Sequence, residues 1–102
     1  MQSMSERVKT EFLVGGAVVA NARDIEQRLS LARRYLLSGD ESRERVTNSV
    51  GKKRLWWASK AAMWYEKART MVIPLSRVNI ERNEIIDSAT ENLVELSQVL
   101  EG

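Results

Sequence analysis

Apolar and small residues recur at helical spacing along the first third of the chain. They lie three or four positions apart, at Val8, Phe12, Gly15, Val18, Ala22, Ile25, Leu29, Ala32 and Leu36. This period is typical of an amphipathic α-helix, so we expect one long helix over about residues 6–38. Gly15 and Gly16 each cost about 1 kcal/mol relative to alanine inside a helix. The pair therefore indicates close helix packing, a break near residue 15, or a short hairpin around the two glycines.

The later helical segments are bounded by residues that end helices. Gly39 can adopt the left-handed conformation that terminates a helix, so the first helix is expected to stop there, with a loop or short helix over residues 39–48. A second helix is expected over about 49–72, because Pro74 disfavours helical geometry in the residue before it. A third is expected over about 75–100, with its apolar stripe at Leu75, Val78, Ile86, Ala89, Leu93, Leu96 and Leu100.

The second segment is apolar on two sides, which places it between two neighbours. One seam contains Val50, Trp57, Ala61, Trp64, Ala68 and Met71, and the other contains Leu55, Ala58, Ala62, Tyr65 and Val72. Short connections make neighbouring helices antiparallel. The sequence therefore predicts an all-α fold, in which a single domain of 102 residues forms an antiparallel three-helix bundle with the second helix at its centre.

The composition removes most catalytic and metal-binding chemistry. The chain has no histidine and no cysteine, which excludes disulfides, thiolate nucleophiles and zinc sites with nitrogen or sulfur ligands. The sequence also lacks a glycine-rich nucleotide loop and a paired metal-binding motif. Acidic residues recur at helical spacing from Glu81 to Glu91, and such a row is typical of a solvated helix face. We expect neither an enzyme nor a protein that holds a cofactor or metal.

The longest apolar run is too short to cross a bilayer. It covers nine residues, 12–20, against about 20 for a membrane-spanning helix. Charged residues of both signs precede it and no small-residue cleavage site follows it, which does not fit a signal peptide. Without disulfides or a membrane span, the expected location is the cytoplasm.

Charge is divided unevenly between the second and third helices. Residues 43–69 hold eight basic and two acidic side chains, whereas residues 81–102 hold six acidic and one basic side chain. Two hypotheses follow. Either the two sets match each other within the bundle or between subunits, or the basic strip over residues 43–69 is exposed and binds nucleic acid or an acidic protein.

The aromatic tract at residues 56–65 holds all three tryptophans. Trp57 and Trp64 are seven positions apart on one seam, so we expect both in the core. Trp56 is turned about 100° away, toward Lys60 and Met63, and it forms a candidate contact patch with the neighbouring cations. The candidate residues for contact with a partner or with nucleic acid are Lys52, Lys53, Arg54, Trp56, Lys60, Met63 and Lys67.

Two short fragments are similar to the tetratricopeptide repeat. The spacing of that repeat's first helix and turn is found in Leu31, Ala32, Tyr35, Gly39 and Asp40. Its second helix resembles the fragment with Ala61, Tyr65, Glu66, Lys67, Ala68 and Pro74. Because extra residues separate the two fragments, the resemblance implies an analogy to helical-hairpin adaptor modules rather than membership of that family.

These features favour a small non-enzymatic protein-interaction module, such as an adaptor, small chaperone, assembly subunit or inhibitor. The alternative is a nucleic-acid-binding or regulatory protein that uses the basic strip. Self-association is also expected, because three helices in a chain of 102 residues cannot cover two apolar seams and the long stripe of the first helix. A homodimer is the simplest such arrangement.

Overall fold

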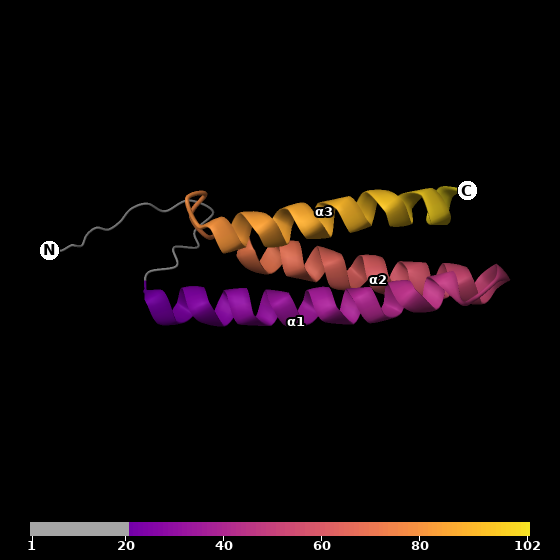
Figure 1. Ribbon diagram of the computed structural model, residues 1–102, viewed down its shortest axis with the longest axis horizontal. Coiled ribbons are helices and arrows are strands. Elements are labelled where there is room, and N and C mark those ends of the chain that lie inside the picture. The colour runs from indigo at the N-terminus through magenta and orange to yellow at the C-terminus, as the bar shows by residue number, and fades with distance from the viewer. Residues whose placement is uncertain (1–20) are drawn as a thin grey trace, which may run out of the picture.

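The described part of the chain folds into three long antiparallel helices. A computed structural model describes residues 21–102, with α1 at Ala22–Thr47, α2 at Gly51–Val72 and α3 at Ile80–Glu101. α2 lies between the other two helices, which make few contacts with each other (Figure 1). The predicted all-α three-helix bundle with a central second helix is therefore confirmed. The expectation of one continuous helix over about residues 6–38 is wrong at Asn21, because its backbone is extended and α1 begins at Ala22. The part of that expectation before residue 21, with Gly15 and Gly16, lies outside the described residues.

α1 begins at a side-chain cap and continues beyond its expected end. The Asn21 Oδ1 atom accepts a hydrogen bond of 2.9 Å from the Asp24 N–H, which satisfies one of the free donors of the first turn. The prediction that this helix stops at Gly39 is wrong, because Gly39 is helical and buried and α1 runs on to Thr47. Segment 39–48 is thus mostly the last part of α1, not a loop or a separate helix.

The α1–α2 and α2–α3 connections are short, and particular residues determine where the next helix begins. Gly51 has a φ of 63°, a conformation that costs an ordinary residue about 1–2 kcal/mol, and it starts α2. After α2, Leu75 is buried in the turn, and Asn79 caps α3 by accepting a 2.8 Å hydrogen bond from the Arg82 N–H. The expected start of the third helix at residue 75 is therefore too early, since Ile80 is its first residue.

The buried face of α2 lies between the two seams that the sequence predicts. It consists of Ala58, Ala61, Tyr65, Ala68 and Val72, each 0% exposed. Because most of these side chains are small, the neighbouring helices can approach α2 closely. The first residue of each predicted seam is not buried, since Val50 is 84% exposed and Leu55 is 45% exposed. Trp57 and Trp64 are only partly buried. The prediction that both belong to the core is therefore wrong for Trp64 and holds only in part for Trp57, which packs against the edge of a core cluster.

Tyr65 is the largest fully buried side chain of residues 21–102, and its ring lies against Gly39. A β-carbon at residue 39 would stand 2.8 Å from the ring atom Cε1, which is closer than dense packing allows. The Tyr65 hydroxyl donates a hydrogen bond to Asp40 of α1. Burial, reinforced by this bond, raises the pKa of Tyr65 above its usual range. Gly39 and Asp40 thus hold the ring from two sides.

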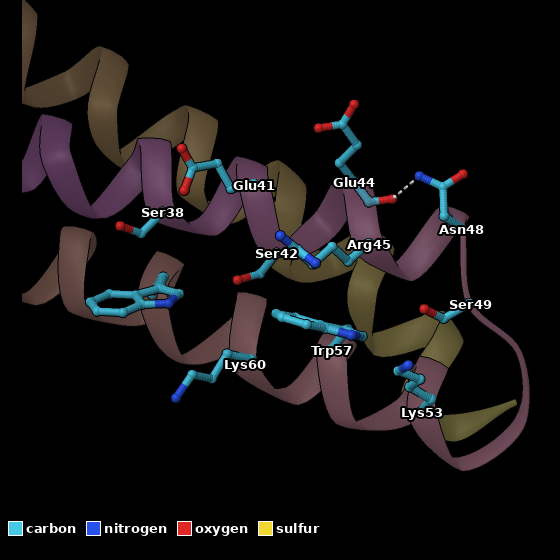
Figure 2. Close-up of a pocket in the computed structure, with 11 residues that line it drawn as sticks. Ser38, Glu41, Ser42, Glu44, Arg45, Asn48, Ser49, Lys53, Trp57 and Lys60 are labelled. Atoms are coloured by element: carbon cyan, nitrogen blue, oxygen red, sulfur yellow. Dashed lines mark hydrogen bonds between the residues drawn. The ribbon is translucent and has the colours of Figure 1, made fainter.

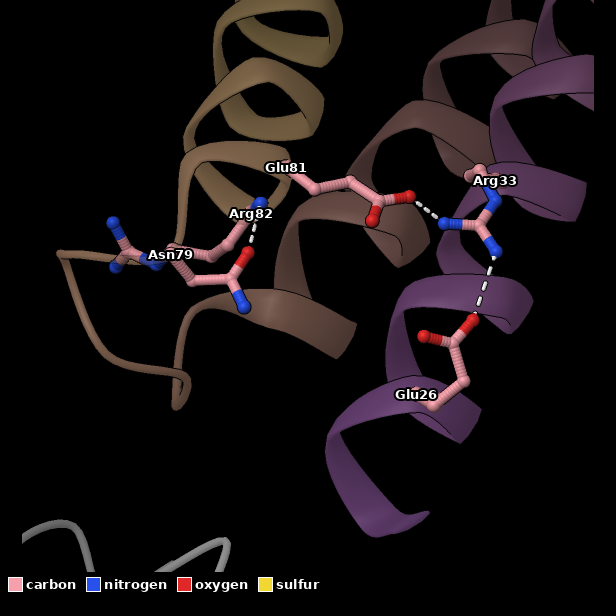
Figure 3. A network of polar contacts seen from close by, with 5 residues as sticks. All are labelled: Glu26, Arg33, Asn79, Glu81 and Arg82. Atoms are coloured by element: carbon pink, nitrogen blue, oxygen red, sulfur yellow. Dashed lines mark hydrogen bonds and ion pairs between the residues drawn. The ribbon is translucent and has the colours of Figure 1, made fainter. Parts of the chain in front are cut away.

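An ion-pair network links α1 to the start of α3 (Figure 3). Arg33 of α1 pairs with Glu81 of α3, and it also lies 3.2 Å from Glu26, seven positions earlier on the same face of α1. The side chains of Arg33 and Glu81 are 44% and 41% exposed. Exposed pairs contribute only about 0–1 kcal/mol each, so this network helps to set how the helix ends meet more than it stabilises the bundle.

The other link between these helices involves Arg43, a member of the basic strip. Arg43 donates a hydrogen bond to Asn92 Oδ1 and lies 3.4 Å from a carboxylate oxygen of Glu95. Within residues 21–102, no further cation of the strip forms an ion pair with α3. The hypothesis that the basic strip and the acidic helix neutralise each other inside one chain therefore holds for Arg43 and not for the rest of the strip.

Replacing Gly39 with alanine is expected to destabilise the bundle, although alanine is the better helix former. Alanine gains about 1 kcal/mol in helix propensity, whereas overpacking against a fixed ring costs about 1–3 kcal/mol. Urea denaturation should show a lower free energy of unfolding for Gly39→Ala, and an unchanged or higher one for Ser30→Ala at an exposed position of the same helix. Equal stabilisation by both substitutions would mean that Tyr65 does not pack against residue 39.

The free energy of unfolding should fall at alkaline pH because of Tyr65. Its pKa is raised in the folded state, so the folded chain holds this proton more tightly than the unfolded chain, where tyrosine titrates near pH 10. The contribution is complete below about pH 10 and is lost as the pH rises toward the folded-state pKa. Comparison with Tyr65→Phe isolates the effect of this hydroxyl, and wild type should lose stability more steeply. Parallel curves would contradict the assignment.

Candidate interaction groove

An open groove lies between α1 and α2, and its lining includes no residue of α3. The groove has a volume of about 990 Å³. Side chains from both helices face it (Figure 2). They include Ser38, Ser42, Arg45, Lys53, Trp57, Lys60 and Trp64. A second hollow of about 500 Å³ lies farther along the same two helices, beside Tyr35, Met63 and Lys67. The two hollows together follow much of the length of α2.

One stripe of α2 alternates lysine and tryptophan. Lys53, Trp57, Lys60, Trp64 and Lys67 are four, three, four and three positions apart, so their side chains leave the helix on one face. Residues seven apart are separated by about 10.5 Å along the helix axis. Successive lysines are therefore about two helical turns apart, and one tryptophan lies between each lysine and the next.

The facing stripe of α1 is shorter and also carries an aromatic ring and a cation. It consists of Tyr35, Ser38, Ser42 and Arg45, at steps of three, four and three. The Tyr35 ring stacks on Trp64, with centroids 5.7 Å apart and planes 28° apart. Between Tyr35 and Arg45 the stripe has only serines, whose short side chains leave space above the α2 stripe. The groove exists at this place because of that difference in size.

A cation lies over the ring of each tryptophan. The distances to the ring centroids are 4.8 Å for Arg45 over Trp57, 5.6 Å for Lys60 over Trp56 and 5.0 Å for Lys67 over Trp64. Such contacts contribute about 0.5–1 kcal/mol each at exposed sites, which is enough to bias the position of a flexible side chain. The α1–α2 face thus offers positive charge on fixed aromatic supports rather than free ring faces.

The predicted contact residues do not all share one surface. The two hollows are lined by Lys53, Lys60, Met63 and Lys67. Trp56 is 56% exposed and meets Trp57 edge to face, with centroids 4.8 Å apart. Lys52 and Arg54 are exposed but line neither hollow. The basic triplet is divided because consecutive helical residues point about 100° apart.

Two features of the groove depend on the fold and could not be expected from the helical pattern alone. Arg45 faces α2 only because α1 continues past Gly39. Trp57 and Trp64, expected in the core, line the groove instead. A signal for the second feature was present in the sequence, because lysine recurs every seventh residue beside the tryptophans and charged residues seldom occupy a buried stripe.

Cations outnumber carboxylates along the two hollows. Five cations, Arg28, Arg45, Lys53, Lys60 and Lys67, stand against Glu41, Glu44 and Glu66. Figure 2 shows the Glu44 carboxylate pointing away from Trp57, whereas the Arg45 guanidinium lies above that ring. The arrangement therefore suits a ligand that has both negative charge and apolar surface.

Comparison with known proteins gives no match to a protein-family model, to a curated protein or to a solved structure. Among residues 21–102, no group of three or more acidic side chains is arranged to hold a metal ion. None of the three helices combines the length and the apolar character that a bilayer crossing requires.

Alanine substitutions should rank the aromatic residues of α2 by their burial. Tyr65→Ala removes a fully buried ring and is expected to lower the free energy of unfolding by about 3–5 kcal/mol. Trp64→Ala removes a partly buried ring stacked on Tyr35 and should lower it by about 1–3 kcal/mol. Trp56→Ala should have an effect below about 1 kcal/mol. Urea denaturation checks the order, and a largest loss for Trp56→Ala would show that the helical phase of α2 is wrong.

Proposed function

We propose that the protein is a non-enzymatic interaction module whose α1–α2 groove docks an acidic, amphipathic helix of a partner protein. The observation that carries this proposal is the alternation of lysine and tryptophan along α2, opposite Arg45 of α1. Helix-in-groove recognition uses an apolar helix face and anchor residues three, four and seven positions apart. The antiparallel helices α1 and α2 lie side by side, so a third helix in the groove between them can contact both.

The spacing of the cations supports a helical ligand. Lys53, Lys60 and Lys67 repeat every seven residues, a separation of about 10.5 Å along the axis. In a docked helix that has a carboxylate at every seventh residue, the carboxylates are also about 10.5 Å apart. One ligand helix can therefore meet all three lysines without bending, and its apolar positions then fall beside the tryptophans.

The partly buried tryptophans support a protein ligand in a second way. Trp57 and Trp64 already lose part of their surface to α1, so their remaining exposed area is rigid. Tryptophan and arginine are enriched among the residues that carry most of the binding energy in protein interfaces. Rings that are ordered before binding lose little conformational entropy on docking.

Nucleic-acid binding by the basic strip is the second candidate, favoured by the exposed ring of Trp56 beside Lys60. Single-stranded nucleic acids bind by stacking bases on free aromatic faces. The Trp64 ring is stacked on Tyr35 and carries Lys67, and the Trp57 ring carries Arg45. These occupied faces favour an anionic helix over a stacked strand.

The proposal is tested with two probes, a synthetic amphipathic helix of leucine and glutamate and a single-stranded oligothymidylate. Tight binding of the peptide is expected, and Lys53→Gln, Lys60→Gln and Lys67→Gln together should weaken it about tenfold, as expected for three exposed contacts of about 0.5 kcal/mol each. Fluorescence anisotropy of a labelled probe measures both affinities. A matched control removes three exposed charges outside the groove, with Arg23→Gln, Arg34→Gln and Arg77→Gln.

The control variant should bind the peptide as wild type does, since it has the same net charge as the groove variant. Equal weakening in both variants would show that net charge alone attracts the peptide, and the groove assignment would fail. Preference for the oligonucleotide, with an affinity that falls steeply with salt, would support the second candidate instead.

A further inference from the structure

The outward face of α3 carries an acidic stripe with one apolar residue near its middle. The stripe consists of Glu84, Asp87, Glu91, Val94, Gln98 and Glu101, at steps of three and four, and all six are exposed. Val94 is 57% exposed. In residues 21–102, the ion pairs of α3 use Glu81 and Glu95, which lie beside the stripe and not on it. Its carboxylates are therefore available to another molecule.

We infer that the groove binds α3 of a second copy of this chain, an inference that rests on the function proposed above. The groove and the α3 stripe carry opposite charges that repeat at the same spacing. Glu84 and Glu91 are seven positions apart, as are Lys60 and Lys67 of the groove. In both helices the charges therefore repeat at about 10.5 Å. With the two helices antiparallel, Glu84 can meet Lys67 and Glu91 can meet Lys60, and Val94 then lies beside Trp57.

The association is head to tail. No residue of α3 lines either hollow between α1 and α2, so the groove and the acidic stripe belong to different faces of the bundle. Two different faces make a heterologous contact, which leaves one groove and one α3 stripe free at the ends of every assembly that does not close into a ring. The small net charge of +2 adds little repulsion between copies. Assembly should therefore grow with concentration beyond a dimer.

Salt dependence follows from the exposure of the charges. Pairs at the surface contribute about 0–1 kcal/mol each and are screened when the salt concentration rises. In low salt, the weight-average mass at tens of micromolar should be at least twice the monomer mass of 11.6 kDa. It should fall toward the monomer mass in high salt. Analytical ultracentrifugation of the full chain measures both.

Two charge-reversed variants test which faces meet. One carries Lys60→Glu and Lys67→Glu in the groove, and the other carries Glu84→Lys and Glu91→Lys on α3. In each variant alone, the groove and the α3 stripe carry charges of the same sign, so the variant is expected to be monomeric. In an equimolar mixture, the acidic groove of the first meets the basic α3 of the second, so the weight-average mass should again at least double. Circular dichroism checks that both variants keep their helix content.

A wild-type chain that stays monomeric in low salt overturns the inference. An equimolar mixture that stays monomeric also overturns it, provided that each variant alone is monomeric. Persistent self-association of either variant alone also overturns it, because another surface would then be responsible. Failure here is distinguishable from failure of the proposed function. If wild type remains monomeric but still binds the leucine–glutamate helix through Lys60 and Lys67, the groove accepts an acidic helix from a different protein.

Discussion

The contact between Tyr65 and Gly39 is the constraint on which the rest of this bundle depends. The remaining buried face of α2 is alanine and valine, so the helices lie close together and a large ring fits only where α1 has no side chain. The hydrogen bond to Asp40 then holds the ring in place. Because the ring needs a helical glycine beneath it, α1 must continue past Gly39. The contact also fixes the rotation of α2 about its own axis.

That rotation determines which residues reach the surface. With Tyr65 inward, Trp64 is about 100° away around the helix and lies at the edge of the α1–α2 seam, on the same stripe as Trp57. The lysines between and beside them are carried to the same edge, where Lys67 rests on Trp64. The proposed docking face is thus a consequence of core packing. Small core residues place the large rings at the surface, and the rings position the cations.

The sequence predicts the number, order and packing of the helices well, because apolar spacing and Pro74 are local signals. It predicts α2 to within two residues at its start. The errors at Gly39 and at the two tryptophans have a common physical cause, since they depend on contacts between helices. Gly39 has the local character of a helix end, and only the Tyr65 ring explains it within α1. Trp57 and Trp64 are the largest residues of their seam, yet close approach of the helices favours alanines in the core.

The rotation of α2 can be measured directly by nuclear Overhauser effects in the full chain. In this account, the Tyr65 ring protons lie within a few ångströms of Gly39, so strong cross-peaks to the Gly39 α-protons are expected. The Trp64 indole should instead show cross-peaks to the Tyr35 ring. Cross-peaks from a tryptophan ring to Gly39, with none from Tyr65, would contradict the account. They would place the tryptophans in the core and remove the groove on which the proposed docking depends.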